Sequence, residues 1–403
     1  MGYNCGSLRV IPPGGRMKTD PSRLPTVDPQ DPYTRRVRGC LLGGALGDAV
    51  GAPIEFAGLR TIRSELGPEG LRDLGVAYGR RGAITDDTQM TLFTAEGLIR
   101  AWVRGESRGI GSPPSVVRRA YLRWLHTQGT SWREAAGEFW DREHPEPDGW
   151  LVGERWLHSR RAPGNTCLGA LEGRFDPAVN TSKGCGGVMR VAPVGLLPGP
   201  GTGGEPTPCE GIFRLGVEIA ALTHGHPSGQ LPAGVLAATL HGIVHQGQTL
   251  SRALDDAIDI LRRHRAHEET LEALQAARSL AGRGKPTAEQ VETLGGGWVA
   301  EEALAIAAYA ALSRPDDLRE AMLLAANHSG DSDSTASITG QLLGAVHGES
   351  ALPADWLADL EGRETINRLA DDFVLQMTGR APMSEVAWGT DFTPEWYLRY
   401  PPS

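Results

Sequence analysis

Cysteine is scarce in this chain, and long apolar runs are missing altogether. The five cysteines among 403 residues are odd in number and lack the spacing of metal ligands. They argue against a disulfide framework and favour free thiols in a reducing compartment. No apolar run approaches the roughly 20 residues that span a bilayer, and the N-terminus has no apolar segment typical of a secretory signal. These absences predict a cytoplasmic protein without a membrane partner.

An excess of positive charge is absent as well. The formal net charge of −9 gives no reason to expect a surface for nucleic acid, which needs clustered Lys and Arg side chains. The Arg-rich stretch 155–161 is short and is typical of a solvated helix face. The apolar fraction of 40% nevertheless supports a substantial core, in one large domain or two medium ones.

Alternation of apolar and polar residues with a period of two, the pattern of half-buried strands, is nearly absent. Apolar residues instead recur at helical spacing through most of the chain after Tyr33. This pattern predicts an all-α protein with a single compact helical domain over residues 33–380. Helices are expected at 35–50, 88–103, 114–126, 209–222, 232–245, 250–263, 267–281, 300–312, 318–326 and 333–346, where the series closes.

The two ends of the chain differ from this helical part. Residues 1–32 are rich in Pro and Gly, which predicts a disordered leader, and Met17 within it is an alternative start. Residues 381–403 are expected to form a C-terminal tail that packs on the domain or extends from it. We expect a monomer.

Two oxygen-rich clusters are the most informative feature of the sequence. The first contains Thr85, Asp86 and Asp87, and the second contains Asp331, Asp333 and Ser334. Their carboxylates and hydroxyls suit hard divalent cations such as Mg²⁺, Mn²⁺ or Ca²⁺ and not zinc. Either cluster alone is typical of a helix cap, but the two together could hold a pair of metal ions. A calcium-binding helical protein is disfavoured because neither cluster lies in an EF-hand loop.

Two acids and two glycine-rich turns accompany the clusters. Asp48 lies in an otherwise apolar run, and a buried acid needs a base, a backbone donor or a metal shell as its partner. Glu55 follows in a loop, where a lone Glu is normally just solvated. The turns are 164–166 and 183–190; their amides at helix starts suit an anion, although a tight loop between packed helices is an equal alternative. His224 ends a helix, where histidines are often only dipole partners.

In this order the segments resemble the ADP-ribosylglycohydrolase family, which includes dinitrogenase reductase-activating glycohydrolase and the ADP-ribosylarginine and ADP-ribosylserine hydrolases. The resemblance runs from about Tyr33 to Gly379 and rests on five ordered motifs. They are G-D-A-V-G-A-P-I-E (47–55), T-D-D-T (85–88), G-N-T (164–166), K-G-C-G-G-V-M-R (183–190) and G-D-S-D-S (330–334). Five motifs in the family's order make a specific match.

The resemblance implies an all-α, orthogonally packed fold with a binuclear Mg²⁺ or Mn²⁺ centre. The implied metal ligands are Thr85, Asp86, Asp87, Asp331, Asp333 and Ser334, and the family usually has Thr where this chain has Ser334. Glu55 matches a mobile acid near the scissile bond, and Asp48 matches a buried acid behind the site. The second turn would hold the diphosphate of ADP-ribose, and His224 would lie against the distal ribose. The implied substrate contacts are Gly164, Asn165, Thr166, Gly184, Cys185, Gly186, Gly187, Met189 and His224.

The implied activity is metal-dependent hydrolysis that releases ADP-ribose from a modified protein side chain, with arginine as the best guess. Alternatives are O-linked ADP-ribose on serine and ADP-ribose on a nucleobase, the one case in which nucleic acid would be a partner. One departure bears on this choice: several members carry an Asp two residues before the G-N-T glycine, where this chain has Ala162. A non-catalytic ADP-ribose-binding or structural protein would keep the same fold, but the complete ligand set and Glu55 argue against it.

Overall fold

The computed structural model describes residues 25–173, 176–198, 208–386 and 389–402. Most of the predicted leader, with Met17, lies outside them. Within the described residues, α-helices form nearly all the regular structure, beside two short pairs of strands. The prediction of an all-α fold is therefore confirmed.

The helices follow one another along the chain with short connections. They are α1 (Pro32–Gly51), α2 (Leu59–Leu66), α3 (Asp86–Arg108), α4 (Pro113–Thr127), α5 (Trp132–Ala136), α6 (Asn165–Glu172), α7 (Ala192–Gly195), α8 (Pro208–Ala221), α9 (Pro227–Gln246), α10 (Leu250–Leu261), α11 (Glu268–Ala281), α12 (Ala288–Glu292), α13 (Ala300–Ser313), α14 (Leu318–Ala326), α15 (Ser332–His347), α16 (Ala354–Asp359), α17 (Arg363–Met377) and α18 (Pro394–Arg399). Short 3₁₀ turns lie at Gly137–Phe139, Leu151–Gly153, Arg155–Leu157, Cys185–Gly187 and Glu349–Ala351.

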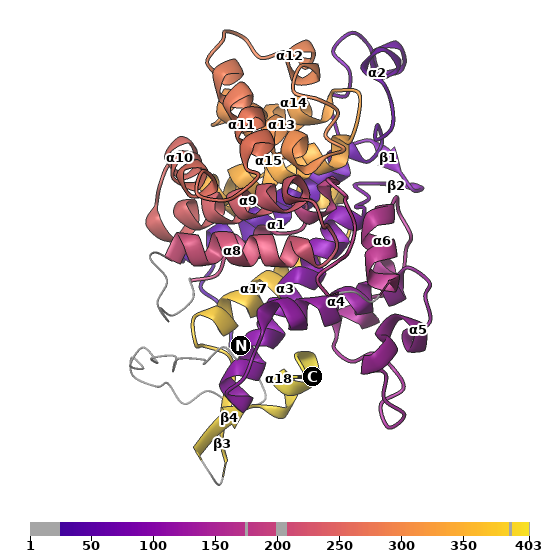
Figure 1. Cartoon of the computed structure of the whole chain (residues 1–403), viewed down its shortest axis with the longest axis vertical. Helices are drawn as coiled ribbons and strands as arrows, with labels where there is room; N and C mark the ends of the chain where they lie inside the picture. The colour runs from indigo at the N-terminus through magenta and orange to yellow at the C-terminus, as the bar shows by residue number, and fades with distance from the viewer. Residues whose placement is uncertain (1–24, 174–175, 199–207, 387–388, 403) are drawn as a thin grey trace.

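The strands form two small antiparallel hairpins. Strand β1 (Val76–Ala77) pairs with β2 (Arg80–Arg81), with Val76 opposite Arg81. Strand β3 (Met383–Val386) pairs with β4 (Gly389–Phe392), with Met383 opposite Phe392. The first hairpin comes just before α3, and the second lies at the lower end of the molecule in Figure 1.

Helices α1 and α15, near the middle of the molecule (Figure 1), pack with their backbones in contact. Glycine recurs every four residues along one face of α1, at Gly39, Gly43, Gly47 and Gly51. A Cβ atom at Gly43 would lie 2.3 Å from the carbonyl oxygen of Gly340 on α15, and one at Gly47 would lie 2.0 Å from that of Ala336. The lack of side chains on this face lets α1 bring Asp48 close to the start of α15.

A methyl group at Gly47 should disrupt this contact. We expect Gly47→Ala to lower the free energy of unfolding by about 1–3 kcal/mol, the usual effect of overpacking, because the opposing Ala336 oxygen belongs to the backbone and cannot rotate away. Gly105→Ala in α3 is the matched control, since no atom lies within 4 Å of its Cβ position and Ala favours a helix. Urea unfolding of both variants measures the difference. Equal stability of the two would show that α1 and α15 are not in close contact at Gly47.

The other helices surround this central pair. In Figure 1, α11–α14 lie above α1, whereas α3–α5, α17 and α18 lie below it and α6 lies to its right. Apolar side chains from both groups are completely buried, among them Phe93, Trp124 and Phe373 of the lower group and Ile306 and Met322 of the upper group. Within the described residues, no helix combines the length and the apolar composition needed to cross a membrane.

Two of the longer helices differ from the sequence expectations, which also omit several short helices, among them α2, α5, α12, α16 and α18. Helix α9 begins at Pro227 and not at residue 232, so Pro232 lies inside the helix, where its ring removes one backbone hydrogen bond. Helix α17 is missing from the expected series, which closes at residue 346. Its buried residues nevertheless have the spacing of one helix face, at Ile366, Leu369, Phe373 and Val374.

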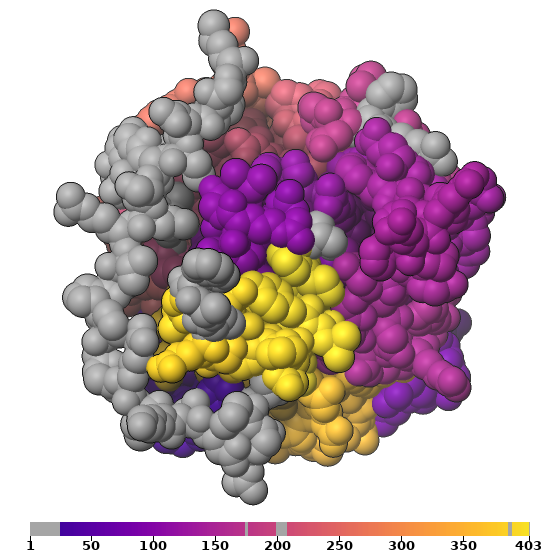
Figure 2. All heavy atoms as spheres, turned by 90° about the horizontal axis from the view of Figure 1, so that it is seen from below, coloured from indigo at the N-terminus to yellow at the C-terminus, as the bar shows by residue number. Residues whose placement is uncertain are grey.

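The C-terminal segment packs on the helical domain through α18. Trp396 and Tyr400 are completely buried. The Trp396 Nε1 donates to the Gln376 side chain at 2.9 Å, and the Tyr400 hydroxyl donates to Asp372 at 2.6 Å. Both acceptors belong to α17. From below, the C-terminal residues (yellow) cover a large part of the lower face (Figure 2).

Candidate functional site

Asp48 lies near the end of α1 with no exposed surface. Its carboxylate accepts hydrogen bonds from the amides of Thr85 (2.9 Å) and Thr88 (3.0 Å) and from the Thr88 hydroxyl (2.5 Å). Burial first, and then the charge of Asp333, raise the pKa of Asp48 to about 7, although these hydrogen bonds oppose the shift. Asp48 therefore fixes the first oxygen-rich cluster from behind.

The first cluster forms the start of α3. Thr85 is the N-cap residue, and its hydroxyl accepts from the Asp87 amide at 3.3 Å. Asp86 accepts from the Gly164 amide at 3.2 Å, which joins the cluster to the G-N-T turn. A cap explains part of this arrangement. It does not explain the buried Oδ2 of Asp87, which has no hydrogen-bond partner.

The second cluster forms the start of α15, where Asp331 is the N-cap and accepts from the Ser334 amide. The Thr85 hydroxyl donates to Asp333 at 3.1 Å, across a separation of 248 residues in the sequence. The Ser334 hydroxyl donates to Asp87 at 3.3 Å. The fold thus brings the two oxygen-rich clusters together, as the pairing of α1 with α15 requires.

Glu55 joins the clusters from the loop after α1. Carboxylate oxygens of Glu55, Asp331 and Asp333 all lie within 4.8 Å of one another, and the buried Oε2 of Glu55 has no hydrogen-bond partner. Burial first, and then the neighbouring carboxylates led by Asp333, raise the pKa of Glu55 to about 11. Crowded, buried carboxylates need a counter-charge, and a donor set of oxygens alone fits hard divalent cations. The residues present therefore fit a metal centre.

The second glycine-rich turn adjoins the clusters. Cys185–Gly187 form a 3₁₀ turn, whose first amides have no partner inside the turn itself. The Cys185 amide donates to the Trp298 carbonyl at 3.2 Å, and its thiol donates to Asp331 at 2.7 Å. The turn is therefore anchored to the second cluster through Cys185. The amides of Gly186 and Gly187 have no hydrogen-bond partner inside the turn and can donate to a ligand.

His224 faces the same turn. Its Nε2 lies 3.2 Å from the position that a Cβ atom on Gly184 would occupy. Burial lowers the pKa of His224 to about 3, and the Thr223 hydroxyl hydrogen-bonds to its Nδ1 at 2.8 Å. The imidazole is therefore neutral at physiological pH and can act as a hydrogen-bond partner but not as a positive charge.

Met189 and Arg190 lie behind the turn. Met189 is 3% exposed, with its sulfur 3.9 Å from the Ser334 hydroxyl. Arg190 is completely buried, donates to Thr223 at 2.6 Å and lies over the ring of Tyr121. Met189 thus lies against a predicted metal ligand, and its contact with ADP-ribose stays a prediction.

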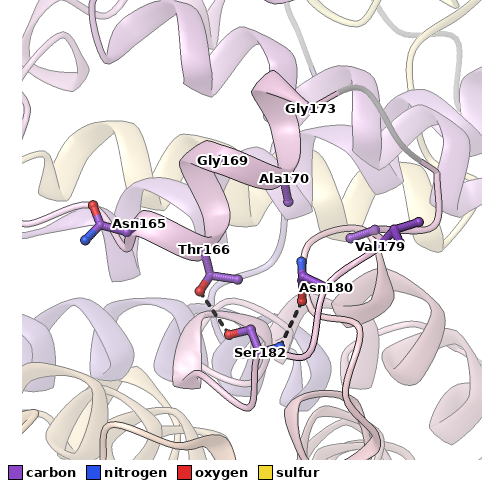
Figure 3. Close-up of a pocket in the computed structure, with 9 residues that line it drawn as sticks. Asn165, Thr166, Gly169, Ala170, Gly173, Val179, Asn180 and Ser182 are labelled. Carbon is purple, nitrogen blue, oxygen red and sulfur yellow. Dashed lines mark hydrogen bonds between the residues drawn. The ribbon is translucent and has the colours of Figure 1, made fainter.

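A cavity of about 300 Å³ lies between α6 and the segment before the second turn. Thr166 on α6 and Ser182 opposite it meet through their hydroxyls at 2.9 Å, and the Ser182 amide donates to the Asn180 side chain at 3.0 Å (Figure 3). Asn165 and Thr166 of the G-N-T motif line the cavity, while Gly164 caps α6. Ser182 also accepts from the Gly184 amide at 3.2 Å, so the cavity adjoins the second turn. Nothing in the sequence indicates a role for Asn180 or Ser182 other than their closeness to that turn.

A buried ion pair behind the first cluster was not expected from the sequence. The Arg161 guanidinium donates to the Ile84 carbonyl at 2.8 Å and pairs with Glu361. Glu361 also accepts from the Ile84 amide at 3.3 Å, across 277 residues of sequence. Glu361 and Asp48 therefore hold the segment before α3 from two sides, and nothing near Glu361 in the sequence indicates this role.

Comparisons with known proteins agree with this arrangement. A family model described as ADP-ribosylglycohydrolase matches residues 29–382. The chain is 26% identical to the ADP-ribosylarginine hydrolase Tri1 of Pseudomonas putida, over 92% of this chain and 86% of the relative. It is 24% identical to the ADP-ribosyl-[dinitrogen reductase] glycohydrolase of Rhodospirillum rubrum, over 81% of this chain and 90% of the relative.

Among solved structures, the chain resembles one titled ADP-ribosylglycohydrolase-related protein complex. The TM-score is 0.55 at 25% identity, and the match covers 86% of this chain and 99% of the other. The family model spans nearly the whole helical domain and includes both oxygen-rich clusters and both glycine-rich turns. The chain therefore belongs to the ADP-ribosylglycohydrolase family, enzymes that cleave glycosidic bonds to ADP-ribose.

Proposed function

We propose that this chain is a divalent-metal-dependent hydrolase that releases ADP-ribose from modified arginine side chains of proteins. The observation that carries the proposal is the meeting of the Thr85–Asp87 and Asp331–Ser334 segments, through hydrogen bonds of 3.1 and 3.3 Å, with Glu55 beside them. Arginine is the preferred linkage because the relative from Pseudomonas putida is named an ADP-ribosylarginine hydrolase.

The proposed cofactor is a pair of Mg²⁺ or Mn²⁺ ions. The residues that would hold it are Thr85, Asp86, Asp87, Asp331, Asp333 and Ser334. The unpartnered Asp87 Oδ2 and the crowding of buried carboxylates support this assignment. When bound, such ions would supply Lewis-acid stabilisation of charge and orient the hydroxyls of the ribose next to the scissile bond.

ADP-ribose is proposed to lie along the two glycine-rich turns. The amides of Gly186 and Gly187 at the start of the 3₁₀ turn would donate to the diphosphate, since glycine allows a close approach of the backbone. The neutral His224 would hydrogen-bond the distal ribose. The cavity beside Thr166 and Ser182 would receive the adenosine end, because it adjoins the second turn through Ser182.

Glu55 is the proposed acid and base. Its unpartnered Oε2 can hold a proton or accept one from water. In hydrolysis the oxygen of water bonds to the anomeric carbon while the bond from that carbon to the arginine nitrogen breaks. Glu55 takes one proton from the water and gives one to the departing nitrogen. The carboxyl group is therefore in the same protonation state before and after the reaction. Both carboxylate oxygens of Asp48 accept hydrogen bonds from Thr85 and Thr88. We therefore assign Asp48 a positioning role.

Release of free ADP-ribose from three substrates tests this function. We expect a peptide with ADP-ribosylated arginine to be hydrolysed faster in Mg²⁺ than peptides with ADP-ribosylated serine or DNA with an ADP-ribosylated base. Chelation by EDTA should slow the reaction by about 10³-fold or more, because Lewis-acid stabilisation worth several kcal/mol is lost. Added Mg²⁺ or Mn²⁺ should restore the rate. An unchanged rate in EDTA would exclude the metal, and cleavage of serine or base linkages alone would exclude arginine.

A further inference from the structure

Two exposed aromatic side chains stack on each other beside the candidate metal centre. Phe56 is 68% exposed and Trp298 is 44% exposed. Their ring centroids lie 5.3 Å apart, with 20° between the planes. Large exposed apolar groups that gather in one place are typical of interaction sites, and neither the metal ligands nor the proposed ADP-ribose contacts account for this pair.

Both rings are tied to acidic residues of the site. Phe56 directly follows Glu55. Trp298 ends a loop in which the Gly296 carbonyl accepts from the Asp331 amide at 2.8 Å. Carboxylate oxygens of Glu55 and Asp331 lie within 4.8 Å of each other. The two segments that carry Phe56 and Trp298 therefore meet at the acidic centre, and the stacked rings lie at its surface.

The backbone at Phe56 is unusual. Its φ angle is +68°, in the left-handed region that bulky residues seldom adopt. The structure keeps a large apolar side chain in this conformation although the ring remains mostly exposed. Residues held in such conformations gather at binding sites, which points to a function for the exposed ring.

We infer that Phe56 and Trp298 contact the leaving group, namely the guanidinium and alkyl chain of the ADP-ribosylated arginine. This assignment rests on the proposed function and adds to it a determinant of linkage. A guanidinium is planar, positively charged and weakly hydrated, and it stacks on aromatic faces. The unpartnered Oε2 of Glu55, next to the ring pair, can accept a hydrogen bond from the guanidinium. A serine hydroxyl offers neither a planar face nor a charge, so the ring pair favours arginine over serine.

Leucine substitutions test the inference, because leucine keeps apolar bulk and removes the aromatic face. In Phe56→Leu and Trp298→Leu, kcat/KM for the arginine-linked peptide should fall about tenfold, mainly through KM, as expected for loss of a desolvated cation–π contact. The affinity for ADP-ribose, measured by calorimetry, should stay within about twofold, since ADP-ribose lacks the guanidinium. Trp298→Phe retains an aromatic face and should keep a KM near that of the wild type.

Phe139→Leu is the matched control. This phenylalanine is also exposed and lies under a guanidinium, with Arg119 at 4.5 Å from its ring, but it belongs to the turn after α5 and should leave the kinetics unchanged. If the affinity for ADP-ribose falls in the two leucine variants as far as kcat/KM does, the inference is wrong, because the rings would then hold ADP-ribose itself. Unchanged kcat/KM in both variants would also overturn it.

The wild-type protein separates this inference from the proposed function. If it releases no ADP-ribose from the arginine-linked peptide, the arginine assignment fails, and with it the guanidinium as the occupant of the ring pair. If it cleaves that peptide but the leucine variants do so equally well, only the role of the ring pair fails.

Discussion

Asp333→Ala should lose essentially all hydrolytic activity and most of its affinity for Mn²⁺. Asp333 lies between the clusters, where its carboxylate accepts from Thr85 and lies close to oxygens of Glu55 and Asp331. Its charge is the first of the neighbouring charges that raise the pKa of Asp87 and of Glu55, after burial. We expect turnover to fall by about 10³-fold or more, as for removal of the metal.

The variant should remain folded. Asp333 lies in the first turn of α15, and its removal takes away one of several mutually repelling carboxylates, so the metal-free variant should be no less stable than the wild type. Turnover at saturating Mg²⁺, calorimetric titration with Mn²⁺ and thermal unfolding in EDTA together make the test. Asp355→Ala is the control, because Asp355 is an exposed acid paired with Arg319 on the surface. Wild-type turnover and Mn²⁺ affinity in Asp333→Ala would mean that Asp333 only stabilises the first turn of α15 and does not bind the metal.

Glu55→Gln should lose turnover while it keeps ADP-ribose. Glutamine preserves the size of the side chain but cannot take or give the proton. We expect kcat to fall by about 10²–10⁴-fold, the usual contribution of a positioned acid or base. The dissociation constant for ADP-ribose should change by less than about fivefold, because the proposed binding groups are elsewhere and the lost interaction belongs to the transition state.

Kinetics and calorimetry on the same preparation decide the role of Glu55. Glu385→Gln offers a control with the same substitution in β3, outside the candidate site. Affinity that falls as far as the rate would place Glu55 among the groups that hold the substrate or the metal. An unchanged rate would move the acid elsewhere, and Asp48 would then be the next carboxylate to replace.

The helical class could be predicted from the sequence because it depends on local patterns. Apolar spacing indicates most of the helices, and even α17, which the expectations omit, shows a clear apolar face at Ile366, Leu369 and Phe373. The sequence predicts that α9 starts at residue 232 because a proline usually begins a helix, but Pro227 begins α9 and Pro232 lies inside it. Which helices pair is not a local property. The four-residue glycine spacing on α1 indicates a close contact, but not that the partner is α15.

The candidate site shows the same division. Its carboxylates and hydroxyls are visible in the sequence because they stand together at two helix starts, and Asp48 is visible because an acid in an apolar run needs a partner. The sequence does not indicate which group is the partner of Asp48. In the structure, the amide and the hydroxyl of Thr88 donate hydrogen bonds to it. Glu361 and Ser182 carry no local signal, since each acts on a segment that only the tertiary fold brings near.

Anomalous diffraction from a crystal soaked with Mn²⁺ and ADP-ribose tests the central claim most directly. The predicted result is one or two strong manganese peaks between Asp86 and Asp87 on one side and Asp331 and Asp333 on the other. Carboxylate oxygens should lie about 2.0–2.6 Å from the metal, the range for hard divalent cations. Ordered ADP-ribose without a manganese peak among these carboxylates, or manganese bound only elsewhere on the protein, would contradict the proposed metal centre.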